Sequence, residues 1–263
     1  MKIDDCRVLL TGASGGIGQA VAEALCREGA HLLVAGRRVA PLHALSQRFP
    51  GQVEVVQADI RTAAGRDAVQ AAVRRFGGLN GVINAAGMNR FSLLEHHDED
   101  AIAELIGVNV TSTLQLTHRL LTELRQREKA LVLNLGSTFG SIGYPGFSAY
   151  CASKFALRGF SEALRRELAD TRVKVLYIAP RATRTAMNSS EVVAMNTELG
   201  VAMDDPAIVA EAVVRALRDE REELFLGWPE KLFVRLNNLL PRQVDQALRK
   251  QLPVVKRFAR TRT

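Results

Sequence analysis

The sequence predicts an α/β fold, a doubly wound parallel sheet in a single domain. Two observations lead to it: short apolar runs alternate with longer amphipathic segments along most of the chain, and small polar residues follow the ends of several runs. In such a sheet the helices cover both faces, and ligands bind outside the carboxyl ends of the strands. We expect the domain to span residues 1–228, with a basic amphipathic helical tail over 229–263.

Six apolar runs have the length and composition of buried strands. They cover residues 7–10, 31–36, 53–58, 81–84, 130–136 and 173–179, and residues 223–227 are a candidate for a last edge strand. Apolar residues at three- and four-residue spacing predict helices over 17–29 and 63–77, over a long segment from about 98 to 127, and over the segment that holds Tyr150.

Composition excludes several classes of protein. The chain has 263 residues, of which 47% are hydrophobic, and no apolar run approaches the roughly 18 residues of a membrane-spanning helix. Acidic residues stand near the start, where a signal peptide would carry its apolar run. Three unpatterned cysteines fit reduced thiols, and no histidine pair has metal-ligand spacing. We expect a cytoplasmic protein without a metal site.

The net charge of +7 is concentrated in the tail. Nine of the 35 Lys and Arg residues and two of the 28 Asp and Glu residues lie from position 230 onward, so the tail alone carries +7 and the rest is neutral. With one Trp, three Tyr and no recognition motif, the sequence does not predict nucleic-acid binding.

A glycine-rich turn, "TGASGGIG", connects the first strand to the first helix. Gly12, Gly16 and Gly18 permit a tight turn and let backbone N–H groups approach a pyrophosphate at the helix N-terminus. Glycines alone also fit an ordinary loop, but the flanking strand and helix favour a Rossmann-type dinucleotide site.

The second strand ends with Gly36, Arg37 and Arg38, where proteins that prefer NAD usually carry an acidic residue. A guanidinium binds a 2′-phosphate that a carboxylate would repel. The sequence therefore predicts NADP(H) in preference to NAD(H), with Arg37 as the first candidate ligand and Arg38 as either a second ligand or a surface charge.

Tyr150 and Lys154 stand four residues apart in "SAYCASKFAL", on one face of a predicted helix. Together with "TGASGGIG", "NAAG" (84–87), Asn109 and Ser137, this pair resembles the motif set of the short-chain dehydrogenase/reductase family, over about residues 5–228. The resemblance implies a hydride-transfer enzyme that interconverts a carbonyl and an alcohol. It also implies a cofactor site formed by Gly12, Ser14, Gly16, Ile17, Gly18, Arg37, Arg38, Asp59, Ile60, Asn84, Ala85, Gly87, Tyr150, Lys154, Pro180 and Thr185.

The same resemblance assigns four catalytic residues. Tyr150 is the acid/base, Lys154 lowers the pKa of its phenol, Ser137 orients the substrate oxygen, and Asn109 holds a water that links Lys154 to solvent. Moving a phenol from a pKa near 10 to neutrality takes about 4 kcal/mol, which a nearby ammonium can largely supply. Taken singly, a helix cap for Ser137 and a local turn contact for Asn109 are the alternatives.

The substrate side is less defined. Arg181 occupies a position that is usually glycine in the family, and we expect it either to face the pocket or to point to solvent. Residues 186–204 form a lid in relatives of this type, and its methionines and valines predict an apolar inner surface, with a packed short helix as the alternative. Phe139, Tyr144, Arg181 and Met187 are the candidate substrate contacts.

The tail places Leu232, Leu236, Leu239 and Leu240 on one helical face and, after Pro241, a second apolar face that includes Val244 and Val255. Such basic helices lie on anionic membranes or pack on their own domain or a sister subunit, and packing is favoured.

We therefore expect an oxidoreductase that reduces a hydrophobic ketone or aldehyde, as a homodimer or homotetramer. The alternatives are a 3-oxoacyl carrier-protein reductase, whose acidic carrier would meet basic residues at 125, 127, 129 and 172, and an NADP(H)-binding sensor or scaffold without turnover.

Overall fold

The computed structural model describes residues 1–259 and contains a seven-stranded sheet in which all neighbouring strands run parallel. Their order in space is β3-β2-β1-β4-β5-β6-β7, so the winding reverses between β1 and β4. The strands are β1 (Arg7–Thr11), β2 (His31–Gly36), β3 (Val53–Gln57), β4 (Gly81–Asn84), β5 (Ala130–Leu135), β6 (Val173–Ala179) and β7 (Glu223–Phe225). The predicted doubly wound sheet is confirmed, including its edge strand.

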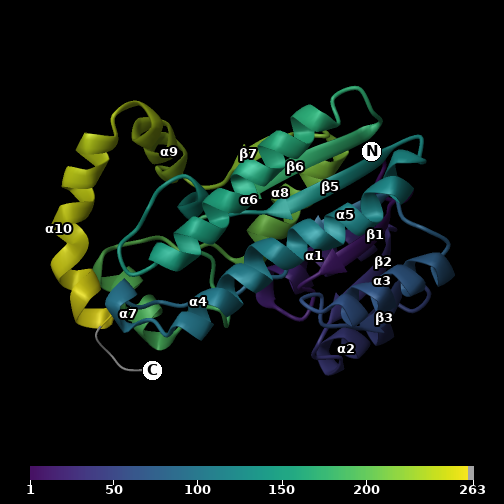
Figure 1. The fold of residues 1–263 in the computed structure, drawn as a ribbon, viewed down its shortest axis with the longest axis horizontal. Coiled ribbons are helices and arrows are strands. Elements are labelled where there is room, and N and C mark those ends of the chain that lie inside the picture. Colours follow the sequence, from purple (N-terminus) through teal and green to yellow (C-terminus); the bar gives the residue numbers. More distant parts are fainter. Residues whose placement is uncertain (260–263) are drawn as a thin grey trace.

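Two layers of helices cover the sheet, as Figure 1 shows. One hydrophobic cluster joins one face of the sheet to α1 (Gly16–Arg27), α2 (Ala40–Arg48) and α8 (Pro206–Arg218). A second cluster joins the other face to α3 (Ala63–Arg75), α5 (Ser112–Arg125) and α6 (Ser148–Glu167). Burial of these two apolar faces is the main force that holds the three layers together.

Helix α2 and the break in the long helix differ from the sequence prediction. Helix α2 was not predicted because only Leu42 and Leu45 of its nine residues are buried, which is too few for a clear period. The segment predicted as one helix from 98 to 127 is α4 (Glu99–Ile106), a π-helical turn (Gly107–Thr111) and α5. The spacing of apolar residues does not reveal a π-helical turn, because such a turn lies inside a helical segment without ending it.

A buried polar network crosses the middle of the sheet. The side-chain amide of Asn84 on β4 donates to Asn134 on β5 at 2.9 Å and to Thr117 on α5 at 3.1 Å. Asn134 in turn donates to Ser161 on α6 at 2.8 Å. These hydrogen bonds tie two central strands to α5 and α6, beside the point where the winding reverses.

The tail forms two helices, α9 (Glu230–Leu239) and α10 (Pro241–Ala259), at one end of the molecule, where α10 lies beside α7 (Ser190–Glu198) (Figure 1). Val244, Val255 and Ala259 of α10 are buried, and Arg257 pairs with Glu198 of α7. The predicted packing of the tail on its own domain therefore describes α10. The last four tail residues, 260–263, lie outside the described residues, and in residues 1–259 no helix is long and apolar enough to cross a membrane.

We predict that Asn134→Ala destabilises the fold strongly. The side chain is fully buried, and its loss removes two hydrogen bonds, one with Asn84 and one with Ser161, and leaves a cavity in the core, at a cost of about 2–5 kcal/mol. Urea unfolding measures the change. The exposed Asn238→Ala is the matched control and should stay within about 0.5 kcal/mol of the parent protein. Equal stabilities for the two variants would contradict a structural role of the network.

Candidate active site

The glycine turn lies at the carboxyl end of β1, next to the loop after β4. Gly12 has a φ of +79°, and a Cβ there would come within 2.6 Å of the backbone of Ala85. A Cβ on Gly18 would lie 2.2 Å from the carbonyl oxygen of Gly12. Both positions therefore require glycine, and they keep the N-terminus of α1 open to the carboxyl edge of the sheet. No side chain among residues 1–259 caps that N-terminus, so its N–H groups suit a pyrophosphate.

Thr185 lies against this turn, although it is far away in sequence. A Cβ on Gly16 would approach Cγ2 of Thr185 to 2.7 Å. Pro180, which ends β6, accepts a hydrogen bond from the backbone of Thr138 at 3.0 Å. The segment after β6 is thus placed beside the glycine turn, as the family resemblance implies for Pro180 and Thr185.

The end of β2 presents two exposed arginines and no carboxylate. Arg38 donates to the carbonyl oxygen of Ser14 at 3.2 Å, which brings it onto the glycine turn. Arg37 is exposed, and its charge helps to lower the pKa of Asp59. A Cβ built on Gly36 would lie 4.0 Å from Oγ of Ser14, so these residues line one corner of the site.

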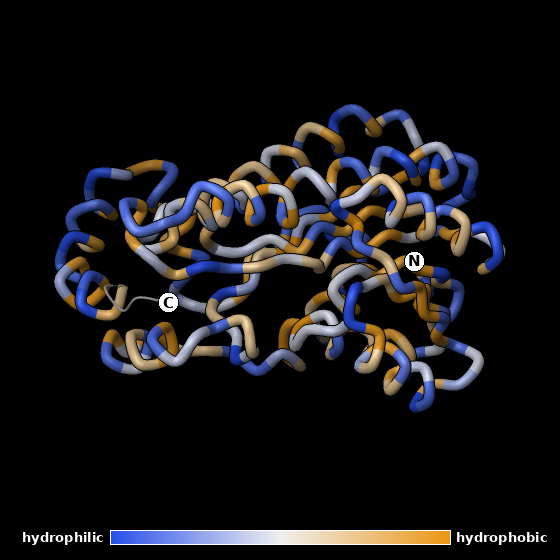
Figure 2. Tube along the Cα trace, turned by 60° about the horizontal axis from the view of Figure 1, so that its bottom comes forward, coloured by the Kyte–Doolittle hydropathy of each residue, from blue (hydrophilic) through white to orange (hydrophobic). Residues whose placement is uncertain are grey.

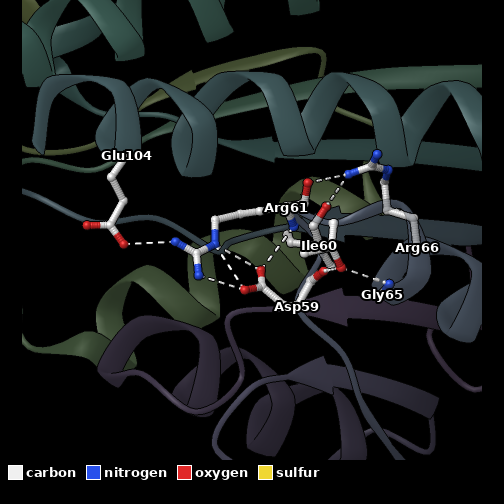
Figure 3. A network of polar contacts seen from close by, with 7 residues as sticks. Asp59, Ile60, Arg61, Gly65, Arg66 and Glu104 are labelled. Carbon is white, nitrogen blue, oxygen red and sulfur yellow. Dashed lines mark hydrogen bonds and ion pairs between the residues drawn. The ribbon is translucent and has the colours of Figure 1, made fainter. Parts of the chain in front are cut away.

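Asp59 follows β3 and is held in a network of polar contacts (Figure 3). Nε and Nη2 of Arg61 donate to the two carboxylate oxygens of Asp59, and Nη1 donates to Glu104 at 2.8 Å. The hydrogen bond from Arg61 is the main cause that lowers the pKa of Asp59. Arg66 donates to the carbonyl oxygens of Ile60 and Arg61, both at 2.8 Å. The network fixes the loop in which the resemblance places the cofactor-site residues Asp59 and Ile60.

Tyr150 and Lys154 lie one turn apart on α6, with the ammonium 5.7 Å from the centre of the phenol ring. Lys154 is 6% exposed, and its Nζ donates to the carbonyl oxygen of Leu135 at the end of β5, at 3.0 Å. Burial lowers the pKa of Lys154 to about 8. The predicted pair is therefore present and lies on the carboxyl edge of the sheet.

The pKa of Tyr150 itself is raised to about 12, mainly by burial, while a hydrogen bond with Ser137 acts in the opposite direction. This direction differs from the lowering by Lys154 that we expected. Lys154 does not offset the desolvation, because its ammonium lies 5.7 Å from the ring centre and donates to the carbonyl oxygen of Leu135 rather than to the phenol oxygen.

Asn109 is buried in the π-helical turn, and its side chain is fully engaged. It accepts from the backbone N–H of Met88 at 2.8 Å and donates to the carbonyl oxygen of Met88 and to Oγ of Ser153, each at 2.9 Å. A Cβ on Gly87 would lie 3.4 Å from Oδ1 of Asn109 and 3.8 Å from Nζ of Lys154. The turn therefore sets Asn109 beside Lys154 and locks the loop after β4. Ser153, which sequence reasoning missed, is the residue that connects Asn109 to α6.

Ser137 caps the short 3₁₀ turn Thr138–Gly140, where its hydroxyl accepts from the backbone N–H of Phe139 at 3.1 Å. The capping alternative thus holds together with the hydrogen bond to Tyr150. Tyr177 on β6 supports this turn, since its hydroxyl lies 3.4 Å from the carbonyl oxygen of Ser137. A Cβ on Gly136 would come within 2.2 Å of the Tyr177 ring. A tyrosine inside an apolar strand was the available signal for this residue, which the sequence reasoning missed.

An apolar cluster covers the phenol side of the site. Phe139 stacks on Tyr144 at 5.1 Å between ring centres, and Tyr150 meets Phe139 and Phe147 edge-on, each at 6.4 Å. Val192 and Met195 of α7 and Val254, Val255 and Phe258 of α10 complete the cluster. Tyr144 also donates to the side-chain oxygen of Gln251 on α10 at 2.7 Å. The structure thus brings Phe139 and Tyr144 to Tyr150, and it adds α10, which the sequence reasoning had not placed there.

Arg181 and Met187 are placed differently. Arg181 pairs with Asp204 at 2.7 Å and with Glu230 of α9 at 3.3 Å, so its charge is matched within the protein and neither expected orientation describes it fully. Met187 is 47% exposed, and so is much of Val193, whereas Val192 and Met195 face the cluster. Residues 186–204 therefore include a short helix, α7, with one apolar face packed on the cluster around Tyr150.

Comparison with known proteins places this arrangement in a family. The family model for short chain dehydrogenases matches residues 7–196. An uncharacterised oxidoreductase of Staphylococcus epidermidis is 30% identical over 217 residues, which cover 82% of this chain and 92% of the relative. Nodulation protein G of Rhizobium meliloti is 32% identical over 185 residues, 69% of this chain and 74% of the relative.

Solved structures agree with the sequence comparison. A short-chain dehydrogenase from Streptomyces avermitilis, 30% identical, superposes with a TM-score of 0.81 over 93% of this chain and 97% of its own. A 3-ketoacyl-(acyl-carrier-protein) reductase from Brucella melitensis, complexed with NADH, has the same fold, with a TM-score of 0.80 at 22% identity over 87% of this chain and 99% of its own. The family model, the relatives and the shared fold agree with the Tyr150–Lys154 pair on the carboxyl edge: the chain belongs to the short-chain dehydrogenase family of oxidoreductases, which act on CH–OH and C=O groups.

Proposed function

We propose that this protein is an NADP(H)-dependent reductase of a hydrophobic ketone or aldehyde. One observation carries the proposal: Lys154, which is buried, and Tyr150, which is half-buried, lie between the loop after β4 that contacts the glycine turn and an apolar cluster. The turn fits a dinucleotide, because its glycines lie where a Cβ would collide with backbone. The apolar cluster fits a substrate whose carbonyl carries hydrocarbon rather than charge.

The residues divide the chemistry as follows. A nicotinamide cofactor held at the glycine turn would supply a hydride to the carbonyl carbon. Tyr150 is a phenol at neutral pH and donates its proton to the carbonyl oxygen, which becomes the alcohol oxygen. Ser137, hydrogen-bonded to the phenol, orients that oxygen. The charge of Lys154 stabilises the phenolate that remains, and the turn around Asn109 provides the route by which a proton returns from solvent.

The preference for NADP(H) rests on the end of β2. Arg37 and Arg38 are exposed there, and Gly36 stands where a carboxylate would repel the 2′-phosphate. Arg38 already contacts the glycine turn through Ser14, which leaves Arg37 as the freer ligand.

The geometry favours a free carbonyl substrate over one delivered by a carrier protein. The basic residues at 125, 127, 129 and 172 flank the starts of β5 and β6, whereas Tyr150 and Lys154 lie at the strand ends. A carrier that docked on those residues would sit at the opposite edge of the sheet, about 20 Å away along a six-residue strand.

We further propose a cytoplasmic homo-oligomer that associates through α5 and α6. Phe155, the residue after Lys154 on α6, is 43% exposed in the single chain. A second subunit that packs on α6 would cover this aromatic side chain.

The first test is the consumption of NADPH and NADH with ketones and aldehydes of graded chain length. We predict NADPH-dependent turnover that rises with chain length and that falls by about 100- to 10,000-fold in Tyr150→Phe, because the variant keeps the ring but loses the acid. A fluorescence titration should show that the Tyr150→Phe variant still binds NADPH tightly, so that the loss of turnover is not a loss of cofactor binding. Binding without turnover in both proteins would instead favour the sensor or scaffold alternative.

We predict that Lys154→Met is inactive yet more stable. The pKa of Lys154 falls from 10.5 to about 8 on folding, so the native state binds fewer protons than the unfolded chain within that window and stability rises with pH across it. At neutral pH the buried charge therefore costs about 3 kcal/mol, which methionine removes. Urea unfolding at neutral and alkaline pH measures this. The gain should shrink toward pH 10.5, and the exposed Lys174→Met should show none.

Arg37→Gln should lower kcat/KM for NADPH by about 10- to 100-fold, since a charge-assisted phosphate contact contributes about 1.5–3 kcal/mol. The value for NADH should stay unchanged, because its ribose carries no phosphate. Arg38→Gln is the matched variant and should lose less. Equal losses with both cofactors would show that Arg37 acts on the fold of the site rather than on the phosphate.

A further inference from the structure

Helix α9 faces its own domain with its less apolar side. Val234 is buried, Asn237 donates to the carbonyl oxygen of Ser141 at 2.9 Å, and Glu230 pairs with Arg181 at 3.3 Å. At about 100° per residue these three positions fall on one side of the helix. This side holds α9 to the domain with one apolar and two polar contacts.

The opposite side of α9 is apolar and exposed. Among residues 1–259, ten large hydrophobic side chains are exposed, and five of them lie between 228 and 240. They are Trp228 (70% exposed), Leu232 (41%), Phe233 (40%), Leu239 (77%) and Leu240 (46%). The four on the helix and its cap share an arc of roughly 120°, the width of a face that a helix normally buries. Helix α9 thus turns its apolar face toward solvent instead of toward its own domain.

Unpaired positive charges surround this apolar face. Lys231 and Arg235 lie on its flank, and Arg242, Arg249 and Lys250 follow along α10. All five are exposed, and none of them forms an ion pair within the described part of the chain. Figure 2 shows hydrophilic and hydrophobic residues alternating along these tail helices.

We propose that α9 and the start of α10 dock on an anionic lipid surface. Charge complementarity decides between the two plausible partners. A second copy would bring an equal set of positive charges against the first, whereas anionic headgroups neutralise them, at about fivefold in binding per charge. An exposed tryptophan just before a helix whose leucines form one face, with lysine and arginine on the flank, is also typical of segments that lie in the membrane interface.

This docking site is separate from the active site and needs no turnover. The exposed apolar residues at 228–240 lie outside the apolar cluster around Tyr150, to which the tail contributes only residues of α10. A variant of this face can therefore lose lipid binding and keep cofactor binding, which distinguishes a failure of this inference from a failure of the proposed reductase function.

Co-sedimentation with vesicles tests the proposal on the full chain. Vesicles of equal parts phosphatidylglycerol and phosphatidylcholine should bind the protein, vesicles of phosphatidylcholine alone should bind it at least tenfold less, and added salt should weaken the binding. Removing two charges with Arg235→Gln and Arg242→Gln should weaken binding by about 25-fold. The matched double variant Arg74→Gln and Arg75→Gln removes two exposed charges from α3. It should bind the anionic vesicles within twofold of the parent protein.

Leu232→Ser with Leu239→Ser tests the apolar part and should abolish sedimentation with the anionic vesicles. Leu94→Ser, at a position 58% exposed elsewhere, is its control. An unchanged Tm and NADPH affinity show that the variants are folded. If the parent protein ignores both kinds of vesicle, or if the leucine variant binds them as well as the parent does, the proposal is wrong. A fall in molar mass of the leucine variant without any vesicle binding by the parent would assign the face to a contact between copies.

Discussion

The buried ammonium of Lys154 is the constraint on which the active site depends. A charge that is 6% exposed must be compensated locally, and here the compensation comes from the carbonyl oxygen of Leu135 at the end of β5. That hydrogen bond fixes α6 against the carboxyl edge of the sheet. Ser153, the neighbour of Lys154 in sequence, then holds Asn109 and with it the loop after β4. A short series of hydrogen bonds thus connects the helix, the π-helical turn and the loop.

Burial moves the two ionisable groups of the site in opposite directions. It raises the pKa of Tyr150 to about 12 and lowers that of Lys154 to about 8. At neutral pH, below both values, Tyr150 is a protonated phenol and Lys154 is a charged ammonium. This is the protonation state that the proposed carbonyl reduction asks of its acid. The apolar cluster that causes the desolvation is the same cluster that would receive the substrate.

Sequence patterns predicted the sheet well because strands buried on both faces read as continuous apolar runs, from residues 7–10 to residues 173–179. They also located the turn at Gly12 and the Tyr150–Lys154 pair, whose spacing is local. They failed where tertiary contacts decide. The π-helical turn at Asn109, the ion pairs of Arg181 and the contact of Gln251 with Tyr144 all join residues whose mutual distance no local pattern encodes. The missed helix α2 shows the other limit, because two buried leucines make no period.

Arg181 gives the architecture a property that its separate contacts do not. Its guanidinium is shared between Asp204, at the end of the segment that covers the site, and Glu230, at the first turn of α9. Asp204 accepts from Nη2 and Glu230 from Nη1, so the two carboxylates use different donors of one rigid guanidinium. The ion-pair triad is therefore a non-covalent crosslink: one planar group holds the first turn of α9 to the segment before α8, and replacing Arg181 would release both ends at once.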